Sequence, residues 1–276
     1  MRYARWMKRA AIVGAGPNGL SAAITLARAG VATTVFEAAD TVGGAARTAE
    51  LTLPGFRHDV GSSVYPMGVA SPFFRELPLE RFGLRWIEPD AAMAHPLEDG
   101  SAVMLEHSIE ATAAGLGEDA AAWRRLMGPL VESWPALCGE VLGPVVHVPR
   151  HPFLLARFGA FAMLPATVLG KMLFRGERAR ALFAGCAAHS VRPLESVMSA
   201  AVGLVLGAAG QALKHGVGWP IVEGGAQALS DALAAYLVSL GGEIRTGVRV
   251  SDLRELGEVD AILCDVSPRQ LRQFAV

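Results

Sequence analysis

The amino-terminal quarter of the chain alternates short apolar runs with a glycine-rich turn and an amphipathic segment. Ala10–Val13 and Val31–Phe36 are short and apolar, as is typical of strands buried in a parallel sheet. Leu20–Ala29 between them has the length and composition of a helix, and Gly30 stands where a helix would end. Strand, helix and strand in such close succession predict a right-handed βαβ unit.

The middle of the chain, residues 76–218, is rich in Ala and Leu and punctuated by prolines, a pattern that predicts mostly short helices. The βα pattern then returns, with a helix expected over Ser230–Leu240 and strands over Glu243–Val250 and Asp260–Asp265. Strands at both ends around a helical insert predict an α/β fold in which one discontinuous domain carries a second domain. The expected boundaries are 1–75, 76–218 and 219–276.

Three stretches are apolar enough to raise the question of a membrane segment. Ser196–Leu213 is uncharged for 18 residues but rich in Gly, Ala and Ser, so we favour a buried helix. Phe153–Phe174 contains basic residues and an internal proline, and predicts an amphipathic helix pair. The basic start, residues 1–10, runs into the glycine turn and is interpreted as a short tail before a strand.

Composition narrows the class of protein. The 276 residues are 52% hydrophobic, with 25 Lys and Arg against 26 Asp and Glu, which argues against a disordered chain and a general nucleic-acid binder. The cysteines Cys138, Cys186 and Cys264 form no CxxC pair and no metal quartet. This spacing argues against a disulfide scaffold, a metal site and a dithiol redox centre. We expect a folded cytoplasmic protein.

The turn after the first strand carries the first chemical motif. It reads as G-x-G-x-x-G, formed by Gly14, Gly16, Pro17, Asn18 and Gly19. In this pattern the first glycine permits a tight turn, the second lets the backbone approach a pyrophosphate, and the third packs helix against strand. Glu37 follows the second strand, 23 residues after Gly14, where a carboxylate accepts ribose hydroxyls and repels a 2′-phosphate. The motif predicts a dinucleotide site without choosing between NAD and FAD.

A second glycine turn follows shortly after Glu37. Gly43 and Gly44 let the backbone pass close to an extended ligand, and Arg47 and Thr48 follow them. The alternative interpretation is a plain glycine turn with a solvated arginine.

These motifs resemble those of phytoene-dehydrogenase-like flavoproteins, within the superfamily of carotenoid desaturases and flavin amine oxidases. The resemblance is strongest to the branch labelled pyridine nucleotide-disulfide oxidoreductase domain-containing proteins. It rests on GAGPNGLSAA (14–23), VGGAART (42–48), FRHDVGSS (56–63), GWPIVEGG (218–225) and CDVSPRQ (264–270), and covers nearly the whole chain.

The resemblance implies FAD as the cofactor and hydride transfer from a substrate C–H bond to flavin as the reaction. It implies a Rossmann-like FAD-binding domain at 1–75 and 219–276 and a mainly helical substrate domain at 76–218. Gly14, Gly16 and Gly19 would hold the pyrophosphate, with Pro17 and Asn18 in the same turn, and Glu37 the adenosine ribose. The segment beside the pyrophosphate and ribityl chain would contain Gly43, Gly44, Arg47 and Thr48. The residues near the flavin would be Asp59, Gly61 and Ser62, and Val250 would contact adenine.

Members of this family are longer and return late in the chain to a further glycine-rich, flavin-binding segment. No such segment follows Asp265 here. We therefore expect a truncated chain, or one whose remainder a partner chain supplies.

The expected function is oxidation of an apolar, isoprenoid- or carotenoid-like substrate, with catalytic residues and electron acceptor unidentified. A non-catalytic dinucleotide- or prenyl-binding protein on the same fold, a flavin amine oxidase and an NAD-dependent dehydrogenase are the alternatives. Peripheral contact with an anionic membrane is a further expectation, with a solvated basic face as its alternative. The basic residues concerned are Arg150, Arg157, Lys171, Arg175, Arg178 and Arg180.

Overall fold

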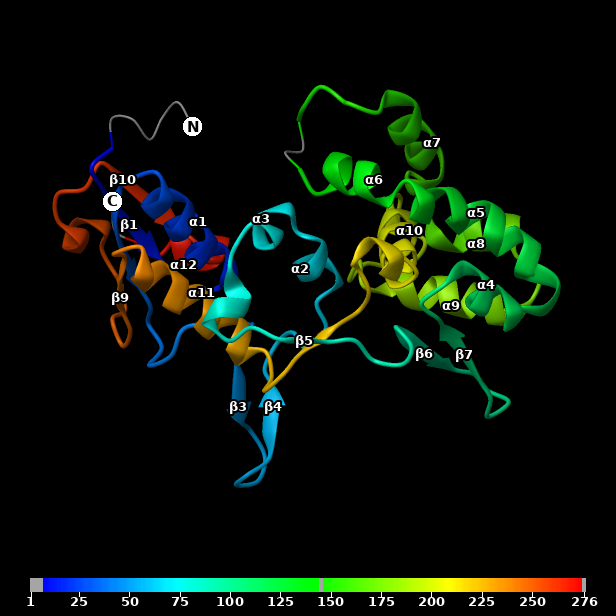
Figure 1. Cartoon of the computed structure of the whole chain (residues 1–276), viewed down its shortest axis with the longest axis horizontal. Helices are drawn as coiled ribbons and strands as arrows, with labels where there is room; N and C mark the ends of the chain where they lie inside the picture. The colour runs from blue at the N-terminus through cyan, green and yellow to red at the C-terminus, as the bar shows by residue number, and fades with distance from the viewer. Residues whose placement is uncertain (1–6, 144–145, 275–276) are drawn as a thin grey trace. The chain divides into compact units, whose positions relative to one another are not determined.

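The computed structural model describes residues 7–143 and 146–274, and these form two compact units (Figure 1). The first unit contains residues up to 64, 77–87 and those from 221 onward, and the second contains 65–76 and 88–220. The division differs from the predicted boundary near residue 75, because the chain enters the helical unit earlier and returns briefly to the first. Residues 1–6 of the basic start lie outside the described residues.

The first unit is built on a four-stranded parallel sheet. Its order is β10 (Ala261–Cys264), β1 (Arg9–Val13), β2 (Ala32–Phe36) and β9 (Glu243–Arg245). The predicted strand over 243–250 ends early, at Arg245. Beyond it the chain turns at Gly247, whose φ is +70°, and the N–H groups of Gly247 and Val248 donate to the carbonyls of Ala39 and Glu37 instead.

Two helices pack together in this unit. Helix α1 (Pro17–Arg28) packs against β1, β2 and α11 (Gln227–Ser239), and β1 is buried from Ala10 to Val13. The other elements of the unit are β3 (Thr48–Glu50), β4 (Arg57–Asp59), η1 (Leu79–Phe82), β5 (Trp86–Ile87), β8 (Ile221–Val222), η4 (Leu253–Leu256) and α12 (Pro268–Leu271). Strands β3 and β4 pair as an antiparallel hairpin, and β5 pairs with β8 in the same antiparallel sense. The predicted βαβ unit is confirmed.

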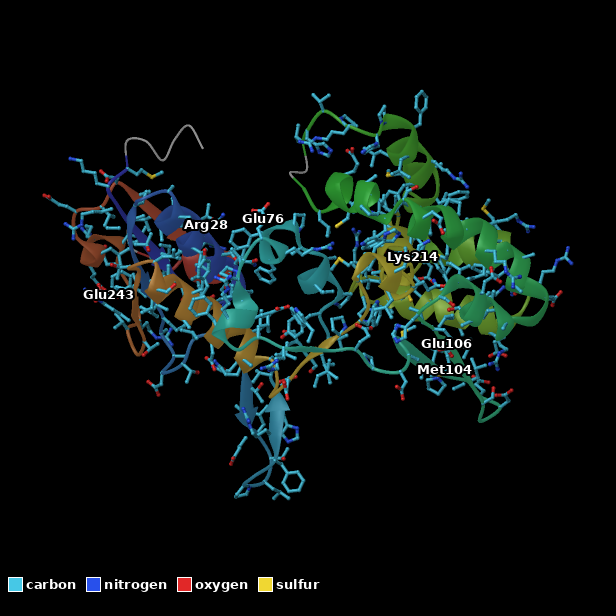
Figure 2. The ribbon with its side chains drawn as sticks, in the orientation of Figure 1. Arg28, Glu76, Met104, Glu106, Lys214 and Glu243 are labelled. Atoms are coloured by element: carbon cyan, nitrogen blue, oxygen red, sulfur yellow. The ribbon has the colours of Figure 1, made fainter. Side chains whose placement is uncertain are left out.

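The second unit is mainly helical, as the sequence predicts. Its elements are α2 (Pro66–Ala70), α3 (Pro72–Arg75), β6 (Met93–Pro96), β7 (Ala102–Leu105), α4 (Ile109–Ala114), η2 (Gly117–Asp119), α5 (Ala120–Glu132), α6 (Trp134–Val141), α7 (Pro152–Ala162), α8 (Ala166–Leu173), α9 (Glu177–Ala188), α10 (Ser199–Gly210) and η3 (Leu213–His215). Strands β6 and β7 form an antiparallel hairpin on which Val103 and Leu105 are buried and Met104 is partly exposed (Figure 2).

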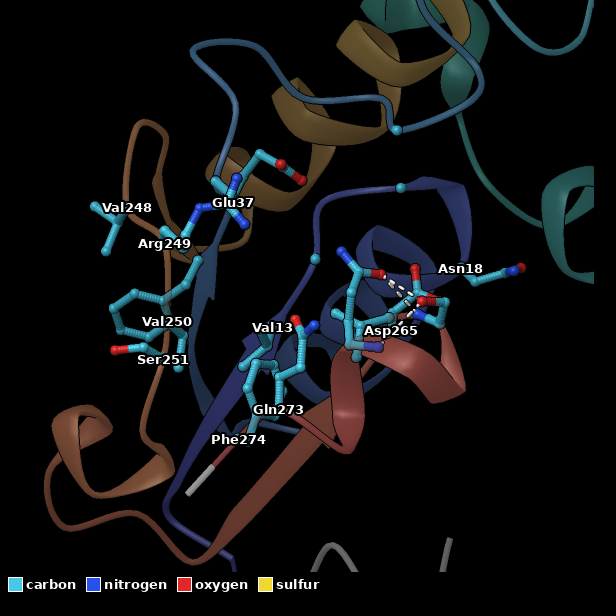
Figure 3. Close-up of a pocket in the computed structure, with 18 of the residues that line it drawn as sticks. Val13, Asn18, Glu37, Val248, Arg249, Val250, Ser251, Asp265, Gln273 and Phe274 are labelled. Carbon is cyan, nitrogen blue, oxygen red and sulfur yellow. Dashed lines mark hydrogen bonds between the residues drawn. The ribbon is translucent and has the colours of Figure 1, made fainter. Parts of the chain in front are cut away.

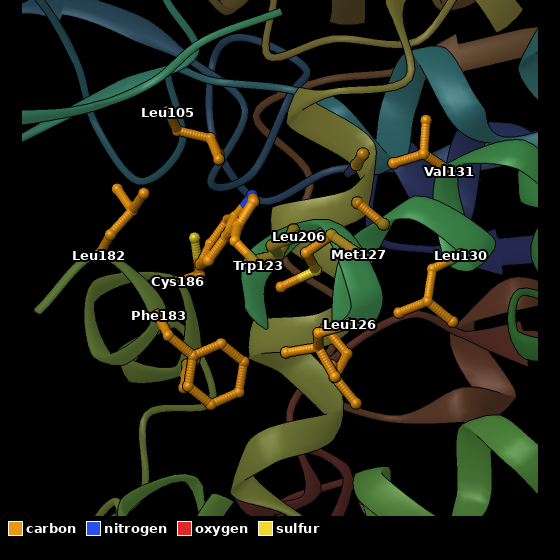
Figure 4. Close-up of a cluster of buried hydrophobic side chains, with 14 of the residues drawn as sticks. Leu105, Trp123, Leu126, Met127, Leu130, Val131, Leu182, Phe183, Cys186 and Leu206 are labelled. Carbon is orange, nitrogen blue, oxygen red and sulfur yellow. The ribbon is translucent and has the colours of Figure 1, made fainter. Parts of the chain in front are cut away.

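The core of the second unit is formed by apolar side chains from several helices. Trp123 on α5, Phe183 and Cys186 on α9, and Leu206 on α10 lie close together there (Figure 4). The Trp123 Nε1 donates to the Gln211 side-chain oxygen at 3.0 Å, so the buried indole N–H is satisfied. The unit therefore has a hydrophobic core of its own.

The apolar stretches form short helices. Ser199–Gly210 forms a single, largely buried helix, and Pro165 separates α7 from α8 as the sequence predicts. Among the described residues, no single helix is long and apolar enough to cross a membrane. Only α7 and α8 taken together meet that criterion, and they are bent by 96° relative to each other.

Candidate functional site

The first glycine turn joins β1 to α1. Gly14 has a φ of +106°, and a Cβ there would clash with the backbone oxygen of Asp265. A Cβ at Gly19 would clash in the same way with the backbone oxygen of Gly14. Gly16 has ordinary extended backbone, and a Cβ there would point toward the Asp265 carboxylate at 3.3 Å. The three glycines therefore occupy the positions that the motif requires.

Glu37 lies directly after β2 and faces this turn. Its carboxylate accepts hydrogen bonds from the backbone N–H groups of Ala15 at 2.8 Å and Ala39 at 2.9 Å. The two bonds use one lone pair on each carboxylate oxygen and fix the orientation of the group. The remaining lone pairs are available to accept hydroxyl donors from a ligand.

The second glycine turn docks onto the first. The N–H of Gly43 donates to the carbonyl of Ala15 at 2.8 Å. Gly44 has a φ of +55°, and a Cβ there would lie 3.4 Å from the Gly16 Cα. Two motifs that are separate in the sequence therefore pack against each other, and Gly16 and Gly44 lie side by side at one pocket.

Both turns line a pocket of about 630 Å³ at the carboxyl ends of β1 and β10 (Figure 3). The chain connects β1 to β2 on one side of this point and reaches β10 on the other, so the pocket lies at a topological switch point of the sheet. Its lining includes Gly14, Gly16, Pro17, Asn18, Glu37, Gly44, Val248, Arg249, Val250, Ser251, Asp265 and Phe274.

The pocket brings together seven of the residues singled out from the sequence, and Gly19 packs directly behind it. Val250, expected against adenine, is 8% exposed and lies on the same segment as Arg249 (Figure 3). The others lie outside this pocket: Gly43, Arg47, Thr48, Asp59, Gly61 and Ser62. Gly61 passes closely against the second glycine turn, since a Cβ there would lie 2.9 Å from the Ala45 Cβ.

Arg47 and Thr48 line a second, more open pocket of about 720 Å³. The Nε of Arg47 is buried and has no hydrogen-bond partner in the part of the chain that the structure describes. A buried donor without a partner costs free energy, so the group is suited to an acceptor that a ligand would bring.

Thr48 and Asp59 hold the N-terminus of α11. The Thr48 hydroxyl donates to Asp59 Oδ1 at 2.6 Å, the Ala226 N–H donates to the same oxygen at 2.9 Å, and the Gln227 N–H donates to the Thr48 hydroxyl at 3.1 Å. Burial by itself would raise the pKa of Asp59, but the hydrogen bonds from Thr48, Ala226 and Ser63 outweigh it and lower the pKa. Thr48 and Asp59 thus stabilise the N-terminus of α11 next to the site.

Asp265 is one of several pocket residues that were not predicted as site residues from the sequence, together with Val248, Arg249, Ser251 and Phe274. The Asp265 Oδ2 accepts the N–H of Gly19 at 2.7 Å, and its own N–H donates to the Val13 carbonyl. The signal in the sequence was its position at the end of the last predicted strand, because carboxyl ends of parallel strands meet at one edge of a sheet.

Comparisons with known proteins agree with this geometry. Residues 12–77 match the family model described as an NAD(P)-binding Rossmann-like domain. The chain is 37% identical over 99 residues to a limonene dehydrogenase subunit from Castellaniella defragrans, covering 36% of this chain and 18% of that protein. It is 28% identical over 291 residues to pyridine nucleotide-disulfide oxidoreductase domain-containing protein 2 of Mus musculus, covering 89% of this chain and 48% of that protein.

The structure also superposes on wild-type putrescine oxidase bound to putrescine, with a TM-score of 0.62 and 22% identity. The match covers 97% of this chain and 60% of that one. The resemblance predicted from the motifs is confirmed for the fold: the chain carries a Rossmann-type dinucleotide-binding fold. The chain spans less than half the length of either curated relative.

Proposed function

We propose that this chain binds FAD and forms the cofactor-binding part of an oxidoreductase that acts on an apolar substrate. The observation that carries the proposal is the docking of the second glycine turn onto the first, at one pocket that Glu37 also faces. The first turn and Glu37 would suit NAD or FAD equally. The second turn adds Gly44 and Ala45 to the pocket lining beyond the first turn, which favours the longer FAD.

The residues fit the parts of FAD by their chemistry. The N-terminus of α1 beside Gly16 directs its positive end toward a pyrophosphate, although its Gly19 N–H is taken by Asp265, and the Glu37 carboxylate offers acceptors to ribose hydroxyls. Glu37 disfavours a 2′-phosphate through charge repulsion, which argues against NADP. Arg47, with its unpaired buried Nε, would serve an acceptor group of the extended cofactor.

The proposed reaction is removal of hydride from a substrate C–H bond. Bound flavin supplies the electron-accepting chemistry, and the protein contributes binding, orientation and exclusion of water. An apolar substrate is supported by the name of the limonene dehydrogenase relative. An isoprenoid-like hydrocarbon is the substrate class we propose.

Cofactor binding is tested by titrating the purified chain with FAD and with NAD and following the absorption and fluorescence of the retained ligand after desalting. In the variant Gly16→Ala, the new Cβ would meet only the Asp265 carboxylate, at 3.3 Å, so the fold should tolerate it. We expect FAD binding to weaken at least about ten-fold, because the methyl group occupies the approach to the pyrophosphate.

The matched control is Gly159→Ala on α7, where a Cβ would meet nothing within 4 Å and should leave binding unchanged. Tight NAD binding with no FAD retention would reject the assignment of the cofactor.

The substrate class is tested with the FAD-loaded chain under anaerobic conditions. Bleaching of the flavin absorption by an isoprenoid hydrocarbon, with none by a primary amine, is the expected result. Bleaching by the amine alone would favour a flavin amine oxidase. Retained FAD that no substrate reduces would favour a non-catalytic binding protein.

A further inference from the structure

Three large apolar side chains project into solvent within a short segment of the second unit. Val146, Val148 and Phe153 are 92%, 89% and 91% exposed and lie in the stretch from α6 through the first turn of α7. Most exposed apolar residues of a folded protein are scattered singly, whereas a group marks a contact surface. We call the residues Val146, Val148, Arg150, Phe153 and Arg157 the apolar-cationic surface.

The segment that carries this surface has only basic charged residues in its sequence. Between Glu140 and Glu177 the sequence contains no Asp or Glu and four Arg or Lys residues. Arg150 and Arg157 are exposed, and Arg157 lies one helical turn after Phe153 on α7, so the two side chains are neighbours on the helix surface. Apolar side chains with basic neighbours, and no acidic residue in the same stretch of sequence, are complementary to a surface with an apolar interior and an anionic exterior.

Arg178 and Arg180, counted above among the basic residues expected to face a membrane, form hydrogen bonds with other parts of the second unit. The Arg178 guanidinium donates to the carbonyls of Gly115 and Ala102 and to the Ser101 hydroxyl, and Arg180 Nε donates to the Phe174 carbonyl. These contacts hold both residues against the helical unit. The other four basic residues, Arg150, Arg157, Lys171 and Arg175, are exposed, and the first two lie within or next to the apolar segment.

A buried carboxylate anchors the segment to the unit. Glu140 is 6% exposed and accepts hydrogen bonds from His147 Nε2 at 2.7 Å and from the N–H groups of Arg150 and His151 at 2.8 Å. Three bonds to one side chain fix the backbone on both sides of Val148. The apolar side chains are thus presented outward from a held loop.

We propose that the apolar-cationic surface docks onto an anionic lipid bilayer. Val146, Val148 and Phe153 would enter the boundary between headgroups and acyl chains, and Arg150 and Arg157 would contact lipid phosphates. A protein partner would have to bring its own acidic groups around an apolar pocket, whereas an anionic bilayer offers both at once. The inference uses contacts of the second unit alone and is independent of the proposed cofactor.

The test is co-sedimentation of the purified chain with vesicles of phosphatidylcholine containing phosphatidylserine, and with vesicles of phosphatidylcholine alone. We expect pelleting with the anionic vesicles that decreases as salt increases. The triple variant Val146→Ser, Val148→Ser, Phe153→Ser should bind at least about ten-fold more weakly, because its apolar insertion is lost. The double variant Arg150→Gln, Arg157→Gln should lose about five-fold per charge.

Matched controls come from the loop after α9, where Val191 is 92% exposed and Arg192 is also exposed. Val191→Ser and Arg192→Gln should bind as the unchanged chain does. Because the substituted side chains are about nine-tenths exposed, the triple variant should fold, and its circular dichroism spectrum checks this.

Failure of the unchanged chain to pellet with anionic vesicles would overturn the proposal, as would equal binding of the triple variant. Sedimentation velocity without lipid tests whether the surface instead binds a second copy of the chain. A dimer that forms in the unchanged chain and disappears in the triple variant would assign the surface to a second copy instead.

Discussion

At the scale of single residues, the carboxylate of Asp265 lies in the part of the pocket where the pyrophosphate of a dinucleotide would bind. It accepts the N–H of Gly19 at 2.7 Å, at the positive end of α1. A bound pyrophosphate would lie beside this charge. We expect Asp265→Asn to bind FAD about five-fold more tightly, because about 1 kcal/mol of repulsion is removed. Calorimetric titration measures this, and the gain should shrink at high salt.

The same change should reduce the free energy of unfolding by about 1 kcal/mol, because a charged hydrogen bond at a helix N-terminus becomes a neutral one. Asp260→Asn is the matched control, since Asp260 accepts the N–H groups of Lys8 and Arg9 and does not line the pocket. Weaker FAD binding by Asp265→Asn would instead show that the carboxylate acts mainly by holding the glycine turn.

Asp265 also illustrates what the sequence can and cannot predict. Gly14, Gly19 and Glu37 were found from spacing alone, because their constraints are local to one βαβ unit. The hydrogen bond from Gly19 to Asp265 spans 246 positions in the chain, and no local pattern encodes it. The early end of β9 at Arg245 has a similar cause, since residues 247 and 248 bond to the loop after β2.

At the scale of elements, the position of α11 depends on the cap formed by Thr48 and Asp59. The hydrogen bonds from Ala226 and Gln227 bring a helix to a hairpin more than 160 residues earlier in the chain. We expect Asp59→Asn to lower the free energy of unfolding by about 1 kcal/mol at neutral pH, because a capping anion is lost. Urea unfolding at several pH values measures this difference.

The pH dependence of this difference has a definite sign. The pKa of Asp59 is lowered in the folded state, so its contribution is fully present above the pKa of the unfolded chain, about 4, and is lost as pH falls through the folded value. The unchanged chain and Asp59→Asn should therefore converge in strongly acidic solution. Asp231→Asn on the same helix, which weakens only an exposed bond from Gln227, should cost less.

At the scale of the whole molecule, the two units have separate cores, and among the described residues the dinucleotide pocket is lined by the first unit alone. A ligand that binds the folded state stabilises it by about 2.7 kcal/mol at one hundred times its Kd. We expect FAD to raise the unfolding midpoint of the first unit and to leave that of the second unchanged. Trp123 and Trp134, both buried in the second unit, report on it by fluorescence, while circular dichroism reports on both units.

Thermal unfolding with and without FAD therefore tests whether the units are energetically separate. Trp86 is the described tryptophan of the first unit, and Trp86→Phe removes its contribution from the fluorescence signal. Riboflavin serves as the control ligand, because it lacks the pyrophosphate and adenosine that the pocket would bind. If FAD shifts both signals together, the two units unfold as one cooperative body. If FAD shifts circular dichroism alone, binding to the first unit does not stabilise the second.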